Sequence, residues 1–152
     1  MNGDNAARSI ELLTFRIAEQ EYALDIMSVR EIRGWTHATP LPHAPNYMKG
    51  VINLRGTVLP VMDLSVRLGL TKQEQNDRNV IIVVKLDDTM TGLLVDAVSD
   101  IVALSPEDMQ APPELSANAA EAVVSALTLI DERMVRVLDL SATIKDLEEV
   151  AA

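Results

Sequence analysis

Two short segments of this 152-residue chain occur again, in the same order, in its second half. Residues 58–65 align with residues 134–141, and four of the eight positions are identical. Residues 22–32 align without gaps with residues 91–101. The two offsets, 76 and 69 residues, differ only by the length of a loop. Self-similarity at such spacing indicates a duplicated structural unit, so any fold proposed for the chain must contain one arrangement twice.

Each copy of the repeat contains predicted β-hairpins. Apolar and polar side chains alternate along residues 13–17 and again along residues 22–26, across a short polar turn. A period of two residues is typical of a strand with one buried face, and two such runs in succession predict a hairpin. Residues 51–64 predict a second hairpin that turns at residues 54–56, where Pro60 places part of the second strand at an edge or a bulge.

The second half predicts the same order of strands and turns. Its strands are expected at residues 80–86, 90–96, 122–130 and 134–140. Single helical turns are expected at residues 46–49, 66–68 and 105–108. Gly50 is expected to end the first of these turns and Ser65 to cap the second. A C-terminal helix is expected at about residues 141–150, because apolar residues recur there at helical spacing.

Five short strands in each half, joined by tight turns, favour a small closed barrel over an open sheet with two bare edges. The chain is therefore expected to be a mainly β protein with a single domain over residues 1–152. Its two repeated barrels are expected at about residues 11–70 and 78–140, followed by the helix at 141–150. Two barrels packed together leave a groove, which is a natural place for a peptide or helix ligand.

The charge balance narrows the kinds of partner. With 23 acidic and 13 basic residues, the net charge is −10, which disfavours nucleic acids and anionic lipid surfaces. The apolar runs are too short to cross a bilayer, and residues 1–11 lack the features of a signal peptide. The absence of cysteine favours a reducing compartment. We expect a cytoplasmic protein that is a monomer in isolation, inserts into no membrane and binds other proteins.

Residues suited to catalysis or metal binding are scarce. The only histidines, His37 and His43, lie in a proline-rich loop with no carboxylate at ligand spacing. The sequence contains no nucleophile-elbow, zinc-protease or phosphate-binding motif. We therefore expect no enzymatic activity, no cofactor and no metal. The rival hypothesis is a small hydrolase that uses both histidines with Asp63, and mutation of both histidines would separate the two hypotheses.

Two residues are unusual for their positions. Arg55 is expected at the tip of a hairpin turn, where glycine, asparagine or aspartate is the ordinary choice. An arginine on a surface turn is usually inert, but one on a rigid turn is also a common contact anchor, and the residues alone leave both readings open. For Trp35, the only tryptophan, packing over a barrel end is favoured over ligand contact.

Three stretches of the chain resemble the CheW-like domain family. They are residues 15–35, residues 49–64 with their Asn53-Leu54-Arg55-Gly56 turn, and residues 92–101. The similarity spans about residues 11–149. It implies a fold of two five-stranded, SH3-like barrels packed together, in agreement with the repeat.

The resemblance also implies a function. CheW-like proteins couple transmembrane chemoreceptors to the histidine kinase CheA, and the match is to the stand-alone adaptor. The expected partners are the regulatory domain of a CheA-type kinase and the cytoplasmic tips of chemoreceptors, with recruitment to receptor arrays at the inner face of the membrane. The same adaptor role in a CheA pathway that controls pili or development remains an open alternative.

The resemblance further assigns positions of partner contact. These are Val29, Glu31, Asn53, Leu54, Arg55, Gly56, Val80 and Ile101. One position departs from the family pattern, which often has arginine after the Asp-Leu pair, whereas this chain has Ser65. The departure leaves open any contact that such an arginine would make, and it does not alter the expected fold.

Overall fold

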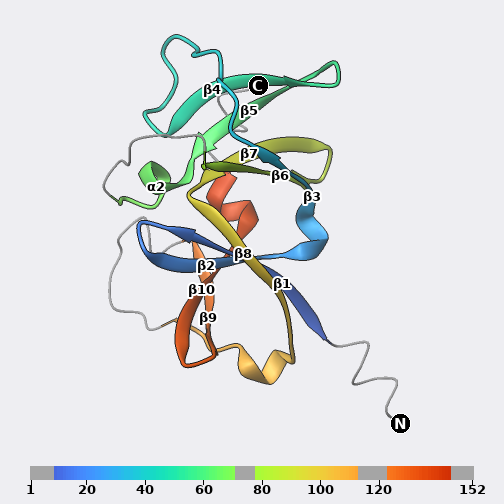
Figure 1. Ribbon diagram of the computed structural model, residues 1–152, viewed down its shortest axis with the longest axis vertical. Coiled ribbons are helices and arrows are strands. Elements are labelled where there is room, and N and C mark those ends of the chain that lie inside the picture. The colour runs from blue at the N-terminus through green and yellow to red at the C-terminus, as the bar shows by residue number, and fades with distance from the viewer. Residues whose placement is uncertain (1–8, 71–77, 113–122, 145–152) are drawn as a thin grey trace.

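The computed structural model describes residues 9–70, 78–112 and 123–144, and shows two five-stranded sheets (Figure 1). The strands are β1 (Ile10–Ile17), β2 (Gln20–Asp25), β3 (Val29–Gly34), β4 (Met48–Leu54), β5 (Thr57–Asp63), β6 (Val80–Leu86), β7 (Thr89–Val95), β8 (Ala97–Leu104), β9 (Val124–Ile130) and β10 (Arg133–Leu138). The helical segments are η1 (Ile26–Ser28), α2 (Leu64–Arg67), η2 (Pro106–Asp108) and residues 140–144. The predicted class, mainly β with two SH3-like subdomains, is confirmed.

Each sheet takes strands from both halves of the chain. Sheet A has the order β8-β1-β2-β10-β9, and sheet B has the order β3-β6-β7-β5-β4. The predicted halves, residues 11–70 and 78–140, each hold five strands, but they do not coincide with the two sheets. The reason is that β3 and β8 cross between the sheets, so two strands of each half lie in one sheet and three in the other.

The predicted closed barrels also differ from what is observed. Backbone pairing in sheet A ends at β8 and β9, and in sheet B at β3 and β4, within the residues that the structure describes. The edge strands β4 and β9 are each covered by one isolated bridge, from Thr39 to Val51 and from Gln110 to Leu127. The subdomains are therefore barrel-like sheets whose two edges are not joined by a continuous ladder.

The register of the strands follows the sequence repeat. Val61 pairs with Gly92 where β5 and β7 run parallel, and Val137 pairs with Ala23 where β10 and β2 run parallel. These pairs differ by the same two offsets, 76 and 69, as the sequence alignment. Both crossing strands have an irregular register at matching positions, after Val29 in β3 and after Val98 in β8. The duplication is thus visible in hydrogen-bond pairing as well as in sequence.

The alternating side chains divide into three apolar clusters because successive residues of a strand face opposite sides. The inter-sheet core lies between the sheets and includes Phe15, Leu64, Ile82, Leu93 and Ile144. The interior of sheet B is formed by Ile52, Leu54, Leu59, Val61, Ile81, Val83 and Leu94. The interior of sheet A is formed by Leu12, Ala23, Ala126, Val135 and Val137.

Asp63, rather than the predicted Ser65, caps α2, and Asp139 caps the helix that follows β10. The Asp63 carboxylate accepts hydrogen bonds from the backbone N–H and the hydroxyl of Ser65, at 3.1 and 2.7 Å. Its repeat counterpart Asp139 accepts the N–H of Ala142 at 3.1 Å. An acidic side chain one position before a helix satisfies the free N–H groups of the first turn. The C-terminal helix begins at residue 140, and its predicted part at 145–150 lies outside the described residues.

The predicted helical turn at residues 46–49 is wrong, because β4 already begins at Met48. Gly50 does not end a helix but lies within β4, with φ of +143°. A Cβ atom at this position would lie 2.2 Å from the carbonyl oxygen of Thr39. The glycine is needed because the Thr39 bridge brings another backbone against this strand.

Candidate functional site

The β4–β5 turn holds Arg55 in a fixed place. Arg55 and Gly56 both have positive φ, +50° and +88°, as a two-residue type I′ hairpin loop requires. The side-chain oxygen of Asn53 accepts the N–H of Gly56 at 2.8 Å, and Leu54 is buried in the interior of sheet B. The arginine side chain itself is 70% exposed. The buried Leu54 side chain therefore fixes the turn, while the Arg55 guanidinium lies on the surface.

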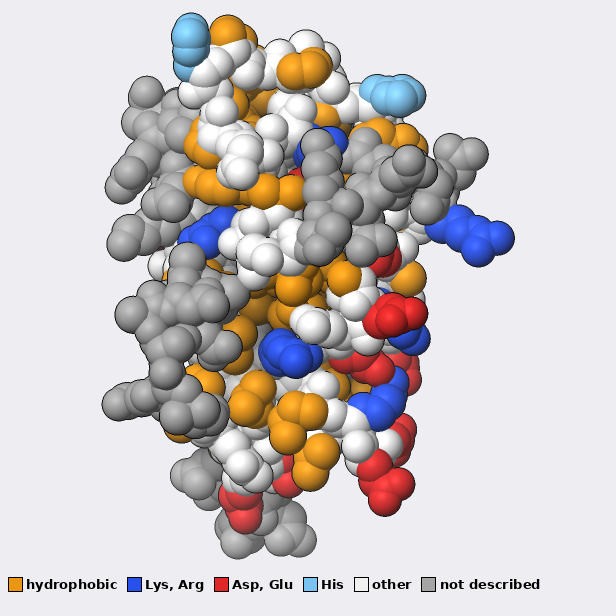
Figure 2. Space-filling view, turned by 90° about the vertical axis from the view of Figure 1, so that its left-hand side faces the viewer, with side chains coloured by type: hydrophobic (Ala, Val, Ile, Leu, Met, Phe, Trp, Pro, Cys, Tyr) orange, Lys and Arg blue, Asp and Glu red, His pale blue; other side chains and the backbone are white. Residues whose placement is uncertain are grey.

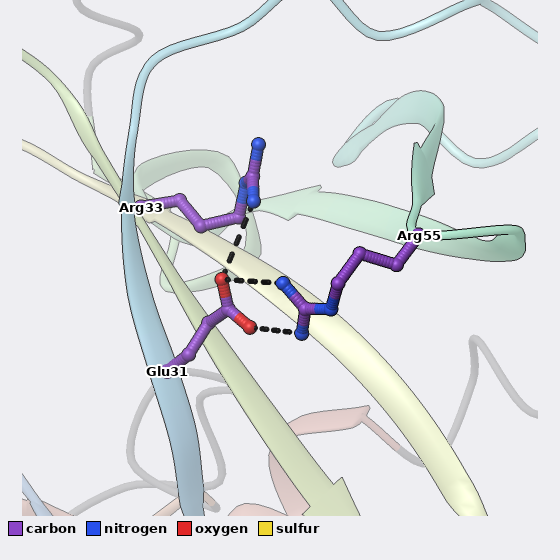
Figure 3. Close-up of polar contacts among 3 residues, drawn as sticks. All are labelled: Glu31, Arg33 and Arg55. Carbon is purple, nitrogen blue, oxygen red and sulfur yellow. Dashed lines mark hydrogen bonds and ion pairs between the residues drawn. The ribbon is translucent and has the colours of Figure 1, made fainter.

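Glu31 of β3 binds Arg55 with both carboxylate oxygens (Figure 3). The Nη2–Oε1 distance is 2.5 Å and the Nη1–Oε2 distance is 3.5 Å. A second arginine, Arg33, places its Nη1 3.3 Å from Oε2 of the same carboxylate. The hydrogen bond from Arg55 is the main cause that lowers the pKa of Glu31 below its ordinary value, against the effect of desolvation. Glu31 is thus an anion held between two guanidinium groups.

This ion pair joins the two edges of sheet B. β3 is one edge strand and β4, which ends in the Arg55 turn, is the other. Side chains therefore link the sheet edges at a place where the backbone ladder does not. An exposed ion pair adds little to stability, but a two-pronged arginine–carboxylate contact fixes direction. Its main effect is to orient the Arg55 side chain along the surface.

The predicted contact residues fall into three groups. Glu31, Asn53, Arg55 and Gly56 come together at the turn, and Leu54 supports it from the buried side. Val29 and Val80 are partly buried and pack against the inter-sheet core. Ile101 lies on β8 of sheet A, where it is 53% exposed. The structure therefore gathers the five polar and turn positions into one site and places Ile101 on the other sheet.

Apolar side chains reach the surface of sheet A as well. Figure 2 shows hydrophobic side chains gathered in its lower half, beside a band along the right-hand edge in which acidic side chains are interspersed with basic ones. The large exposed apolar residues of sheet A are Ile101, Leu129 and Met134. Scattered apolar residues are normal on a surface, so this face by itself assigns no function.

Arg33 belongs to the site but was not predicted. It lies two residues after Glu31, so strand alternation places both side chains on one face. This spacing was the available signal. The Nε atom of Arg33 is buried and has no hydrogen-bond partner in the part of the chain that the structure describes. Ser65, the departure from the family pattern, is buried against Asp63 and presents no side chain to a partner.

The residues of the rival hydrolase hypothesis have unlike surroundings. His37 is exposed, with its ring edge-on to Trp35 at a centroid distance of 5.5 Å, and His43 is exposed in the proline-rich loop. Asp63 is buried and its carboxylate caps α2. Among the described residues, no group of three or more His, Cys, Asp or Glu side chains could hold a metal ion. Trp35 packs against the interior of sheet B, as predicted.

The described part of the chain also contains no helix that is long and apolar enough to span a membrane. What it does contain is a pair of SH3-like sheets, one of which presents an arginine on a braced turn. A rigid β-sheet scaffold that presents polar side chains at a hairpin tip is typical of protein-binding modules.

Comparison with known proteins gives the family. The CheW-like domain model matches residues 11–148, and the chain belongs to this family. It is 49% identical to the "Probable chemotaxis protein CheW" of Rhizobium etli over 93% of this chain and 92% of the relative. It is 45% identical to the chemotaxis protein CheW of Rhizobium meliloti, over 97% and 99% of the two chains. The crystal structure of the scaffolding protein TtCheW from Thermoanaerobacter tengcongensis matches with a TM-score of 0.79 at 31% identity, over 86% of this chain and 84% of that one.

Proposed function

We propose that this protein is a non-catalytic adaptor that joins the cytoplasmic tips of chemoreceptors to the regulatory domain of a CheA-type histidine kinase. The observation that carries the proposal is Arg55, exposed on a rigid turn and oriented by Glu31. Arginine is enriched among residues that dominate protein interfaces, and preorganisation lowers the entropic cost of binding. The relatives are named as chemotaxis proteins, which supports the adaptor role, and the same role in a CheA pathway for pili or development is the alternative.

The adaptor works by binding two partners at once. In this proposal the chain acts as one domain over residues 1–152, as a monomer recruited to receptor arrays at the inner face of the membrane. A receptor state that favours one arrangement of the complex then biases the kinase, because binding at one surface is thermodynamically linked to binding at the other. No chemical step by this chain is required.

The test is charge reversal at Arg55. Arg55→Glu should weaken partner binding by about 2 kcal/mol or more, roughly thirtyfold, because the contact is lost and repulsion replaces it. Arg55→Ala should lose less. Both variants should keep the stability of the parent within about 0.5 kcal/mol, since the side chain is exposed. A reconstituted receptor–kinase assay measures coupling, and thermal melting measures stability.

The matched control is Arg16→Glu, which reverses the charge of an exposed arginine on β1 of sheet A. It should leave coupling unchanged. If Arg55→Glu melts like the parent and still activates the kinase fully, Arg55 is only a turn residue and the proposed site is wrong.

A further inference from the structure

Arg67, the last residue of α2, reaches across to the C-terminal helix. Its Nε donates a hydrogen bond to the carbonyl oxygen of Thr143 and its Nη2 donates one to that of Ala142, both at 3.0 Å. The guanidinium carbon also lies 5.7 Å from the centre of the Tyr47 ring. A single side chain therefore fastens a helix that follows β5 of sheet B to a helix that follows β10 of sheet A.

The C-terminal helix lies between the two sheets (Figure 1). Its Thr143 and Ile144 are fully buried, and Ile144 belongs to the inter-sheet core together with Leu64 and Leu68. Apolar contacts of this kind are strong but non-directional, so they resist separation of the sheets more than they resist sliding. The planar arginine fork adds direction, since its two donors fit the two carbonyl oxygens in only one orientation.

The contact is not a consequence of the repeat. The repeat counterpart of Arg67 is Thr143 itself, whose hydroxyl donates to the carbonyl oxygen of Asp139 within its own helix. Both copies of the duplicated unit therefore have a helix at this place, but only the first copy has an arginine that donates two hydrogen bonds to the other helix. Its presence in a single copy indicates a role in joining the two copies rather than in forming either.

We infer that Arg67 is a positioning residue, which fixes the C-terminal helix to α2 and thereby holds the two sheets at one relative position. Its consequence for binding rests on the proposed function. A partner that contacts both sheets would bind, for example, at Arg55 on sheet B and at Ile101 on sheet A. The distance between these two side chains is constant only if the two sheets keep one relative position.

The absence of cysteine allows a direct test on the full chain. Two spin labels are attached at Asp88→Cys in the β6–β7 turn of sheet B and Met134→Cys in β10 of sheet A, both exposed positions. Pulsed electron paramagnetic resonance then measures the distance between the labels. The parent should give one narrow distance, and Arg67→Gln should give a broadened or shifted one. Arg16→Gln, which removes an exposed arginine from β1, is the control and should match the parent.

Amide hydrogen exchange shows whether Arg67 fixes the relative position of the two sheets or stabilises only the C-terminal helix. Loss of the fork should speed exchange of the Thr143 amide by about tenfold or more, since that amide bonds within the helix. Faster exchange without any change in the label distance would show that Arg67 supports only its helix, and the inference would be wrong. An unchanged distance and unchanged exchange would also overturn it. If Arg67→Gln does not fold, Arg67→Lys, which keeps the charge but lacks the fork, is measured with the same two outcomes.

The spin-label measurement uses no partner, so its result is independent of the proposed function. A negative result of the Arg55→Glu test would contradict the proposed adaptor site but would not bear on the positioning role of Arg67. Conversely, an unchanged label distance in Arg67→Gln would contradict the positioning role of Arg67 and would not bear on the adaptor proposal.

Discussion

The two sheets carry the same hairpin with opposite chemistry at its tip. In sheet B the tip residues are Arg55 and Gly56, and in sheet A the repeat counterparts are Asp131 and Glu132. All four have positive φ, so the backbone of the turn is the same. The duplication thus accounts for the backbone of the turn, whereas an arginine is present at the tip of one copy alone.

The repeat counterpart of Glu31 shows the same divergence. Glu31 in β3 corresponds to Asp100 in β8, but Asp100 has an aspartate and not an arginine at the matching turn. Its carboxylate instead accepts the N–H of Ile101 at 2.8 Å. The arginine of the sheet A hairpin, Arg133, pairs with Glu21 on a neighbouring part of the same sheet. Among the residues that the structure describes, sheet A therefore has no counterpart of the ion pair that joins the two edges of sheet B.

Sheet A has apolar contacts around its interior and backbone contacts from the segment after β8. Partly buried residues surround its interior cluster: Ile10, Val102, Leu104, Met109 and Ile130. The segment after β8 adds two backbone hydrogen bonds between Gln110 and Leu127, at 2.7 and 2.8 Å, and a bond from the Thr128 hydroxyl to the Asp108 carbonyl. Each sheet thus has a segment that covers one edge strand, through Thr39 in sheet B and Gln110 in sheet A, whereas the ion pair between the two edges is found in sheet B.

The largest expected difference between the sheets concerns a close backbone approach. Gly50 in β4 has Ala126 in β9 as its repeat counterpart. Gly50→Ala should destabilise the protein by about 3 kcal/mol, because the new Cβ meets the Thr39 carbonyl and positive φ adds strain. Ala126→Gly, the reverse change in sheet A, should cost about 1 kcal/mol. Urea denaturation measures both, and equal losses would show that the sheets do not differ here.

The sequence predicted the hairpins because one-sided burial leaves a local alternation. It did not predict which sheet β3 and β8 join, since that choice depends on pairing between segments distant in the sequence. The site shows the same division. The turn at Arg55 follows from local residue types, whereas its ion pair joins residues 24 positions apart, and only the family resemblance marked Glu31. Burial of Leu54 inside sheet B likewise depends on contacts with strands distant in the sequence, which supply Ile81, Val83 and Leu94.

A second glycine should give a smaller difference between the sheets. A Cβ atom on Gly92 of β7 would lie 2.9 Å from Cγ2 of Ile81 and 3.3 Å from Cγ2 of Val61. These atoms belong to side chains rather than to the backbone, so Gly92→Ala should cost less than Gly50→Ala, about 1–2 kcal/mol. Its counterpart Ala23 already carries the methyl group, and Ala23→Gly should cost about 1 kcal/mol. A Gly92→Ala protein that is more stable than its parent in urea denaturation would contradict the packing described for sheet B.

The smallest expected effect is on the titration of Glu31. This residue is paired with the arginine of its hairpin, whereas its counterpart in sheet A, Asp100, has no arginine at the matching turn. In the folded protein the Glu31 carboxyl should titrate below its ordinary pKa of 4.5, chiefly because of Arg55. Since the folded-state pKa is lowered, the contribution of the ion pair is fully present above the ordinary pKa and disappears as the pH falls through the lower value.

Carbon-detected NMR of the labelled Glu31 side chain measures this titration. Arg55→Ala should raise its pKa toward the ordinary value, and Arg33→Ala should raise it less, because the Arg33 hydrogen bond is the weaker of the two causes. Asp131→Ala is the control on the other sheet, and it should leave the Glu31 titration unchanged because it alters only the sheet A turn. If Glu31 has the same pKa in the parent and in Arg55→Ala, the ion pair does not form in solution. The two hairpin tips would then differ in composition but not in structure, and Arg55 would reach a partner without having been oriented for it.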